Sequence, residues 1–268
     1  MGHSKWFYDL VVRLWPLGRL VNRAGRLPGI GRLLRPLFSP RENQAIMIPV
    51  HRAIQGTESV VLPYTLLPTL IERAGHRVIL DGCMCRQGQG CRSYPQDIGC
   101  IFLGAGAQGI DPALGRPAHV VEALAHARRA MEAGLVPLIV HASFDAFILG
   151  VPYRRMLAIC FCCDCCCTVR QTLREGPTAF WEAVLRLPGL RVVVTEACTG
   201  CGACLELCHV QAISQQDGRA LIGEQCKGCG RCVAACPSEA LRLQIDEGVD
   251  VVGRLLALVE QRTEIGAA

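Results

Sequence analysis

Cysteine is the residue type with the greatest capacity for chemistry in this sequence, because the 268 residues contain 18 cysteines but only 7 phenylalanines and 3 tryptophans. Cysteines at this density form either a disulfide framework or sets of metal ligands. Disulfide frameworks belong mainly to small secreted proteins. The N-terminus leads into an Arg-rich stretch without the uninterrupted apolar region of a secretory signal. The sequence therefore favours metal ligation in a reducing cytoplasm.

Eight of the cysteines belong to an internal repeat. Cys198 corresponds to Cys226 and Cys208 to Cys236, an offset of 28 residues, and each copy reads C-x-G-C-G-x-C-x-x-x-C. Three closely spaced thiols can wrap around corners of one iron–sulfur cube, and the intervening glycines let backbone N–H groups approach the sulfur atoms. Pairs of C-x-x-C also bind zinc, but the doubled spacing argues for iron–sulfur clusters.

This spacing resembles that of bacterial two-cluster ferredoxins, in which three cysteines of one run and the fourth of the other bind each cluster. The resemblance covers residues 197–245. It implies a first [4Fe–4S] site at Cys198, Cys201, Cys204 and Cys236, and a second at Cys226, Cys229, Cys232 and Cys208. Pro237 keeps the family's proline after the fourth cysteine, whereas His209 replaces it in the first copy. His209 either changes only the turn or brings a protonatable group towards one cluster.

The other ten cysteines lie in two clumps in the middle of the chain. The first clump is Cys83, Cys85, Cys91 and Cys100, and the second is Cys160, Cys162, Cys163, Cys165, Cys166 and Cys167. No helix or strand could bury all six thiols of the second clump as inert apolar groups, because they would point in every direction. We expect metal binding at both clumps, with the metal and the ligand sets left open. His119, His126 and His141 could also bind metal, although an isolated histidine is more often structural.

A short α/β stretch lies between the two clumps and must position them. The apolar spacing predicts a helix over residues 120–132, a C-cap at Gly134 and a buried strand over residues 135–140. Another strand is expected over residues 76–80. The clumps flank this unit, so we expect them to meet at one end of it.

Charge divides the chain into three parts. Residues 1–45 carry a net charge of +6, residues 46–190 one of +2 and residues 191–268 one of −3. Together with the cysteine pattern, this predicts a basic amphipathic arm, a cysteine-rich α/β domain, and a ferredoxin-like domain that ends in a helix near residues 249–262. The expected fold class is α+β, with a C-terminal bacterial two-[4Fe–4S] ferredoxin-like module appended to the cysteine-rich domain.

The basic arm leaves two interpretations open. Its basic residues are Lys5, Arg13, Arg19, Arg23, Arg26, Arg32, Arg35 and Arg41. Trp6, Leu10 and Leu14 recur at helical spacing, so one face could lie on an anionic membrane surface. The arm could equally pack on its own domain or on a partner subunit. No nucleic-acid partner is expected, because no binding motif accompanies the arginines. No membrane-spanning segment is expected either, since the most apolar window, residues 133–151, is interrupted by Pro137, His141 and Asp145.

The wider pattern over residues 46–245 resembles a group of largely uncharacterised 4Fe–4S ferredoxin-type proteins of anaerobic bacteria and archaea. It implies iron–sulfur chemistry in an anaerobic cell. The function expected is electron transfer between redox proteins through two [4Fe–4S] clusters, with at least one further metal centre in the middle domain and three or four clusters allowed in all. The expected location is the cytoplasm or the inner face of the membrane. Two alternatives remain: a reductase with a catalytic iron–sulfur centre in the middle domain, and a metal or cluster carrier.

Overall fold

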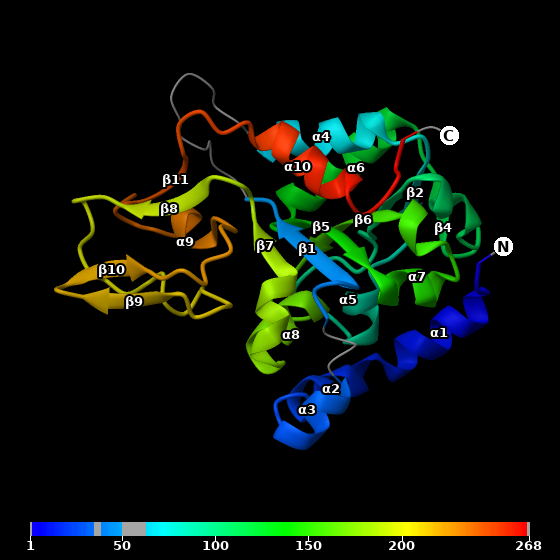
Figure 1. Cartoon of the computed structure of the whole chain (residues 1–268), viewed down its shortest axis with the longest axis horizontal. Coiled ribbons are helices and arrows are strands. Elements are labelled where there is room, and N and C mark those ends of the chain that lie inside the picture. The colour runs from blue at the N-terminus through cyan, green and yellow to red at the C-terminus, as the bar shows by residue number, and fades with distance from the viewer. Residues whose placement is uncertain (1, 35–38, 50–62, 267–268) are drawn as a thin grey trace.

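The computed structural model describes residues 2–34, 39–49 and 63–266 (Figure 1). The N-terminal arm contains α1 (Lys5–Leu14), η1 (Trp15–Leu17), α2 (Gly18–Ala24) and α3 (Pro28–Leu34). The middle of the chain begins with β1 (Asn43–Met47), α4 (Pro63–Arg73), β2 (Arg77–Leu80), α5 (Met84–Gly88), β3 (Ile101–Leu103), η3 (Ala105–Gly109) and β4 (Gly115–Pro117). It continues with α6 (Val120–Glu132), β5 (Val136–Ala142), α7 (Ser143–Leu149), η4 (Tyr153–Arg155), β6 (Leu157–Cys162), α8 (Thr168–Glu175), η5 (Thr178–Ala183) and β7 (Val184–Arg186).

A seven-stranded sheet forms the centre of the molecule, in the order β4-β2-β3-β6-β5-β1-β7. All neighbouring strands are antiparallel except β1 and β7. The presence of both helices and sheets agrees with the expected α+β class. The middle domain differs from the expected α/β arrangement, because its sheet is mostly antiparallel, whereas neighbouring strands of an α/β unit are parallel. The helix α6 connects β4 to β5, which run in the same direction but have three other strands between them.

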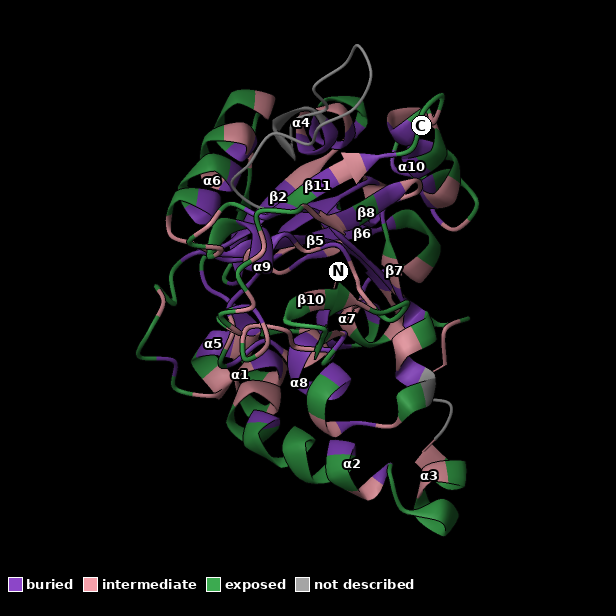
Figure 2. Cartoon of the chain, turned by 90° about the vertical axis from the view of Figure 1, so that its left-hand side faces the viewer, coloured by how far each residue is buried: buried purple, intermediate pink, exposed green. Residues whose placement is uncertain are grey.

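Helices cover both faces of this sheet (Figures 1 and 2). The helices α4, α6 and α10 (Val251–Glu260) lie on one face, and α5, α7, α8 and the N-terminal arm lie on the other. The central strands β5 and β6 are almost fully buried. The first clump follows the buried strand β2 and the second begins within the buried strand β6, so the sheet anchors both.

The helix α6 forms as its sequence predicts. Small side chains on one face, including Ala123 and Ala127, are buried against the sheet. The backbone N–H of His119 donates to Glu122 at 2.9 Å at the N-terminus. Gly134 follows the helix with φ at +79°, the left-handed conformation expected at a helix end. The expected strands agree to within two residues at each end with β2 and β5.

The C-terminal module lies at one end of the molecule (Figure 1). It consists of β8 (Leu190–Val194), β9 (Ile213–Gln216), β10 (Arg219–Ile222), α9 (Arg231–Ala234) and β11 (Leu241–Ile245). β8 pairs with β11, and β9 pairs with β10 through an Asp217-Gly218 turn in which both residues have positive φ. After β11 the chain returns to the middle domain, where α10 packs and Thr263 donates to the carbonyl of Arg154 at 2.9 Å.

The N-terminal arm packs on the middle domain through a few aromatic and polar residues. Tyr8 and Trp15 are buried, and the indole of Trp15 donates to Thr168 Oγ1 at 3.0 Å. Asn22 is also buried and accepts a hydrogen bond from Thr172. The opposite face of the arm, which includes Trp6, remains exposed to solvent. Of the basic residues expected in the arm, Arg35 lies outside the described residues. None of the helices in the described part of the chain combines the length and apolar character that a bilayer crossing requires.

Candidate metal centres

The structure gathers cysteines from both copies of the repeat around one small hollow in the C-terminal module. The four thiols that line it are Cys198, Cys201, Cys204 and Cys236. Three of them come from the loop between β8 and β9, and the fourth comes from the segment after α9. The fold thus juxtaposes the set of four that the repeat predicts for the first cluster.

The second predicted set is brought together in the same way. Cys208 lies beside the loop that carries Cys226, Cys229 and Cys232. Burial raises the pKa of the Cys232 thiol, and the neighbouring thiols of Cys229, Cys226 and Cys208 raise it further. Thiols packed this closely favour a bound cation, because the cation compensates the charge of the thiolates.

The backbone of the module supports the charged form of these sulfur atoms. The N–H groups of Ala220, Gly228 and Ala212 donate to the Sγ atoms of Cys198, Cys226 and Cys208 at 3.4, 3.4 and 3.2 Å. Gly200 and Gly228 have φ values of +67° and +68°. A Cβ on Gly200 would lie 2.2 Å from the carbonyl oxygen of Gly218, so only glycine fits there. The donor set and its backbone therefore fit iron–sulfur clusters.

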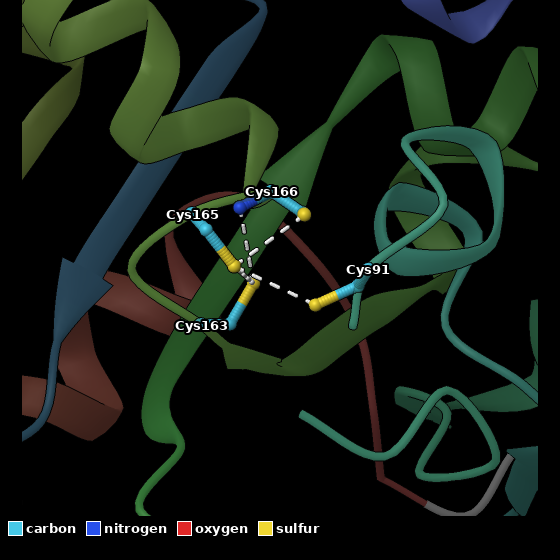
Figure 3. A group of neighbouring side chains, drawn as sticks. All are labelled: Cys91, Cys163, Cys165 and Cys166. Atoms are coloured by element: carbon cyan, nitrogen blue, oxygen red, sulfur yellow. Dashed lines mark hydrogen bonds between the residues drawn. The ribbon is translucent and has the colours of Figure 1, made fainter. Parts of the chain in front are cut away.

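The two clumps of the middle domain meet, as expected from the sequence. Cys91 of the first clump joins three cysteines of the second, and the four Sγ atoms lie within 4.8 Å of one another (Figure 3). We call this group the quartet: Cys91, Cys163, Cys165 and Cys166. Cys165 is exposed, whereas its three partners are buried. Burial raises the pKa of the Cys163 thiol to about 12.

The other six middle cysteines interact in pairs, which are Cys83 with Cys85, Cys162 with Cys167, and Cys100 with Cys160. The thiol of Cys85 is the main cause that lowers the pKa of Cys83 to about 6, and Arg86 contributes to the shift. The first two pairs adjoin one another, since Cys85 lies close to both Cys162 and Cys167. These four thiols form a second candidate ligand set, with the third pair beside it.

Two fully buried arginines lie among the thiols. Arg86 donates to the carbonyls of Pro95 at 2.7 Å and Phe161 at 2.6 Å, and also to that of Ile98. Arg170 pairs with Asp164, but its Nε and Nη2 atoms have no hydrogen-bond partner among the described residues.

The surroundings of Arg170 explain these unpaired atoms. Burial alone would lower the pKa of Arg170, yet the charges of Cys229, Asp164 and Cys167 raise it. A buried cation without partners is costly unless negative charge lies nearby. Arg170 therefore lies between thiols of the module, represented by Cys229, and thiols of the middle domain, represented by Cys167, whose negative charge would compensate it.

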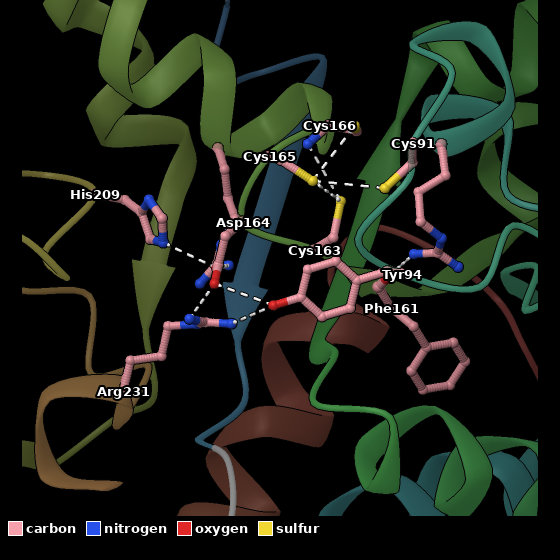
Figure 4. A network of polar contacts seen from close by, with 11 residues as sticks. Cys91, Tyr94, Phe161, Cys163, Asp164, Cys165, Cys166, His209 and Arg231 are labelled. Carbon is pink, nitrogen blue, oxygen red and sulfur yellow. Dashed lines mark hydrogen bonds and ion pairs between the residues drawn. The ribbon is translucent and has the colours of Figure 1, made fainter. Parts of the chain in front are cut away.

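Asp164 connects the middle domain to the C-terminal module (Figure 4). Its carboxylate forms ion pairs with Arg170 and Arg231, and His209 Nε2 lies 3.1 Å from its Oδ1. The hydroxyl of Tyr94 donates to Asp164 Oδ2 at 3.3 Å. Burial raises the pKa of Asp164, but the hydrogen bond from His209 and the two arginines lower it to about 2.

The sequence did not identify this polar group, because its members are far apart in the chain. Two signals were available in the sequence. Asp164 is an acidic residue within a run of cysteines, and His209 replaces the family's proline. His209 points towards Asp164 and so has a structural partner (Figure 4). The other histidines considered as ligands lie outside the quartet: Nε2 of His126 lies 2.8 Å from the carbonyl of Gly99, and that of His141 lies 2.9 Å from the carbonyl of Tyr153.

Comparison with known proteins agrees with this geometry in one part of the chain. Residues 197–240 match the family of 4Fe-4S dicluster domains. No curated protein and no solved structure matches the chain. The chain therefore contains a 4Fe–4S ferredoxin-type module that binds 4Fe–4S clusters, and such modules carry out iron–sulfur electron transfer with redox partners.

Proposed function

We propose that this protein is an iron–sulfur electron carrier whose C-terminal module holds two [4Fe–4S] clusters. Cys198, Cys201, Cys204 and Cys236 would bind the first, and Cys226, Cys229, Cys232 and Cys208 the second. The observation that carries the proposal is the hollow lined by four thiols from both copies of the repeat. Each cluster, when bound, would accept and release one electron.

The chain's own groups would support this function in three ways. Backbone N–H groups donate to the ligand sulfur atoms and stabilise their charged form. Burial of Cys204 and Cys232 excludes water from one side of each site. Cys201 is exposed, so the first site faces solvent and is the one that we propose to face a redox partner.

The middle domain would hold at least one further metal centre, drawn from its ten cysteines. The adjoining set Cys83, Cys85, Cys162 and Cys167 is the candidate for an additional cluster, which would bring the total to three. The proposed division of the chain is the arm (1–45), the cysteine-rich domain (46–190) and the module with its terminal helix (191–268).

The structure has a second hollow, larger than the one lined by the four thiols, and its position favours an electron carrier over a reductase. This hollow is lined by Arg73, Arg155 and Glu260, among others, and lies beside α10. The helices α5 and α8, which adjoin the cysteine clumps, cover the opposite face of the sheet (Figure 1). A substrate in this hollow would therefore be separated from the metal ligands by the sheet.

We further propose that the protein works in the reducing cytoplasm of an anaerobic cell, at the inner face of the membrane. All 18 cysteines are free thiols, which suits a reducing compartment. The arm exposes Trp6, Leu14 and Leu33 beside arginines, a combination suited to an anionic lipid surface.

The test is the iron and acid-labile sulfide content of anaerobically purified protein, combined with EPR of the reduced state. The module alone predicts about eight irons and eight sulfides per chain, and a third cluster raises both to about twelve. Replacing the exposed ligand Cys201→Ser should reduce both contents and change the EPR signal. Replacing the exposed Glu206→Gln in the same loop should change neither. Iron near zero in the native protein would refute the proposal.

A further inference from the structure

The quartet is more compact than the other cysteine groups. Cys165 Sγ lies 3.5 Å from Cys91 Sγ, 3.5 Å from Cys166 Sγ and 3.9 Å from Cys163 Sγ (Figure 3). The quartet is the one group of three or more potential ligand residues in the described part of the chain whose ligand atoms all lie within 4.8 Å of one another. The cysteines of the ferredoxin repeat, all of which are described, are spread more widely.

These distances match the geometry of a single metal ion. Four sulfur atoms at about 2.3 Å from one tetrahedral zinc ion are separated by about 3.8 Å. The thiols on the corners of an iron–sulfur cube must be farther apart, because four irons and four sulfides lie between them. The backbone N–H of Cys166 also donates to Cys163 Sγ at 3.2 Å, which supports a thiolate at that position.

We propose that the quartet binds one Zn²⁺ ion as a tetrahedral tetrathiolate site, separate from the iron–sulfur clusters. This inference deepens the proposed function, since it assigns four of the ten middle cysteines to a different kind of centre. Four thiolates around zinc close the coordination shell, which is typical of a structural rather than a catalytic site.

The position of the quartet indicates what the ion would stabilise. The site joins the loop after α5, through Cys91, to the loop after β6, through Cys163 and its neighbours. Asp164 lies within the second loop and pairs with Arg231 and His209 of the C-terminal module (Figure 4). Zinc would therefore hold in place the loop on which the module docks. The nearby charge of the buried Arg86 offsets part of the negative charge on Cys163.

The first test compares zinc, iron and sulfide per chain in the native protein and in two matched variants with an exposed ligand replaced. We expect about one zinc per chain in the native protein. Cys165→Ser should lose this zinc and retain its iron and sulfide. Cys201→Ser should retain the zinc and lose iron and sulfide. Absence of zinc from the native protein overturns the proposal. Loss of about four irons and four sulfides from Cys165→Ser also overturns it.

The second test needs no variant and so does not depend on whether a variant folds. X-ray absorption at the zinc edge of the native protein should show four sulfur neighbours at about 2.3 Å. Nitrogen or oxygen neighbours would refute a tetrathiolate site. A protein that contains zinc in this geometry but no iron would refute the proposed electron carrier and leave the zinc site standing, so the two proposals fail separately.

Discussion

Asp164 shows how a single residue can join parts of this protein that are distant in sequence. Its carboxylate accepts from His209 and pairs with Arg170 and Arg231, and Arg170 is fully buried. Removal of one partner from such a group leaves the remaining charges uncompensated, which costs more than the loss of a surface ion pair. Asp164 therefore belongs among the residues that determine how the module docks.

Replacement of Asp164→Asn should lower the free energy of unfolding by about 3 kcal/mol, because two arginines lose their anion. Anaerobic urea unfolding measures this change, with the metal content determined in parallel to show that the neighbouring thiols remain loaded. The control is Asp246→Asn, which removes an ion pair with Arg191 in which both side chains are half exposed. Its effect should stay below about 0.5 kcal/mol. Equal losses in the two variants would contradict the assigned role.

The arm illustrates what a single element can and cannot reveal about its packing. The helical spacing of Trp6, Leu10 and Leu14 marks an apolar face, but this face points to solvent. The arm docks instead through Tyr8 and Trp15 on the other side. Both sides of the arm carry large apolar residues, so periodicity alone could not decide which side the domain would cover.

The contact between η1 and α5 is so close that one added methyl group on α5 should disturb it. A Cβ on Gly88 would lie 2.4 Å from Cβ of Trp15, so Gly88→Ala should push the arm away. We expect a loss of about 2 kcal/mol in stability and faster tryptic cleavage at Arg13 and Arg19.

The matched control is Gly29→Ala in α3, where a Cβ would meet no atom within 4 Å. This change should stabilise the helix by up to about 1 kcal/mol or leave it unchanged, and proteolysis of the arm should not accelerate. Arm cleavage that is as slow in Gly88→Ala as in the native protein would show that the contact is not needed for docking.

At the scale of the whole molecule, exposed apolar side chains are concentrated on one side. Of the thirteen large hydrophobic residues that are exposed in the described part of the chain, nine lie in the arm, and Phe144 and Phe147 of the adjoining helix α7 add two more. Residues 2–34 carry six basic side chains and one acidic side chain. Large apolar side chains that gather on one exposed element favour a binding partner, and the positive charge of the arm matches an anionic lipid surface.

This distribution predicts binding to anionic vesicles. The protein should sediment with phosphatidylglycerol vesicles but not with phosphatidylcholine vesicles, and high salt should weaken the binding. Trp6 is 73% exposed, so Trp6→Ser should leave the fold intact and weaken binding about tenfold.

The control for this variant is Val121→Ser, which replaces a residue that is 77% exposed on α6, on the opposite side of the sheet. It should bind as the native protein does. Equal binding to both kinds of vesicle, or equal effects of the two substitutions, would rule out a specific membrane face on the arm.

The sequence by itself determined the features that depend on local spacing. The repeat of Cys198 and Cys226 predicted the ferredoxin-type module, because ligands of one cluster must come from a tight loop. The apolar period of residues 120–132 predicted α6, because burial of one helical face imposes that period. The meeting of the two clumps could also be expected, since they flank one α/β unit.

Only the tertiary structure decided how the cysteines are grouped and what lies between the groups. Ten thiols allow many sets of four, and the choice of Cys91 as the partner of Cys163, Cys165 and Cys166 depends on where the loops after α5 and β6 approach each other. The antiparallel order of the sheet and the contact of Asp164 with Arg231 are likewise long-range. Long-range contacts depend on how whole elements pack against one another. The spacing of residues along the chain does not specify that packing.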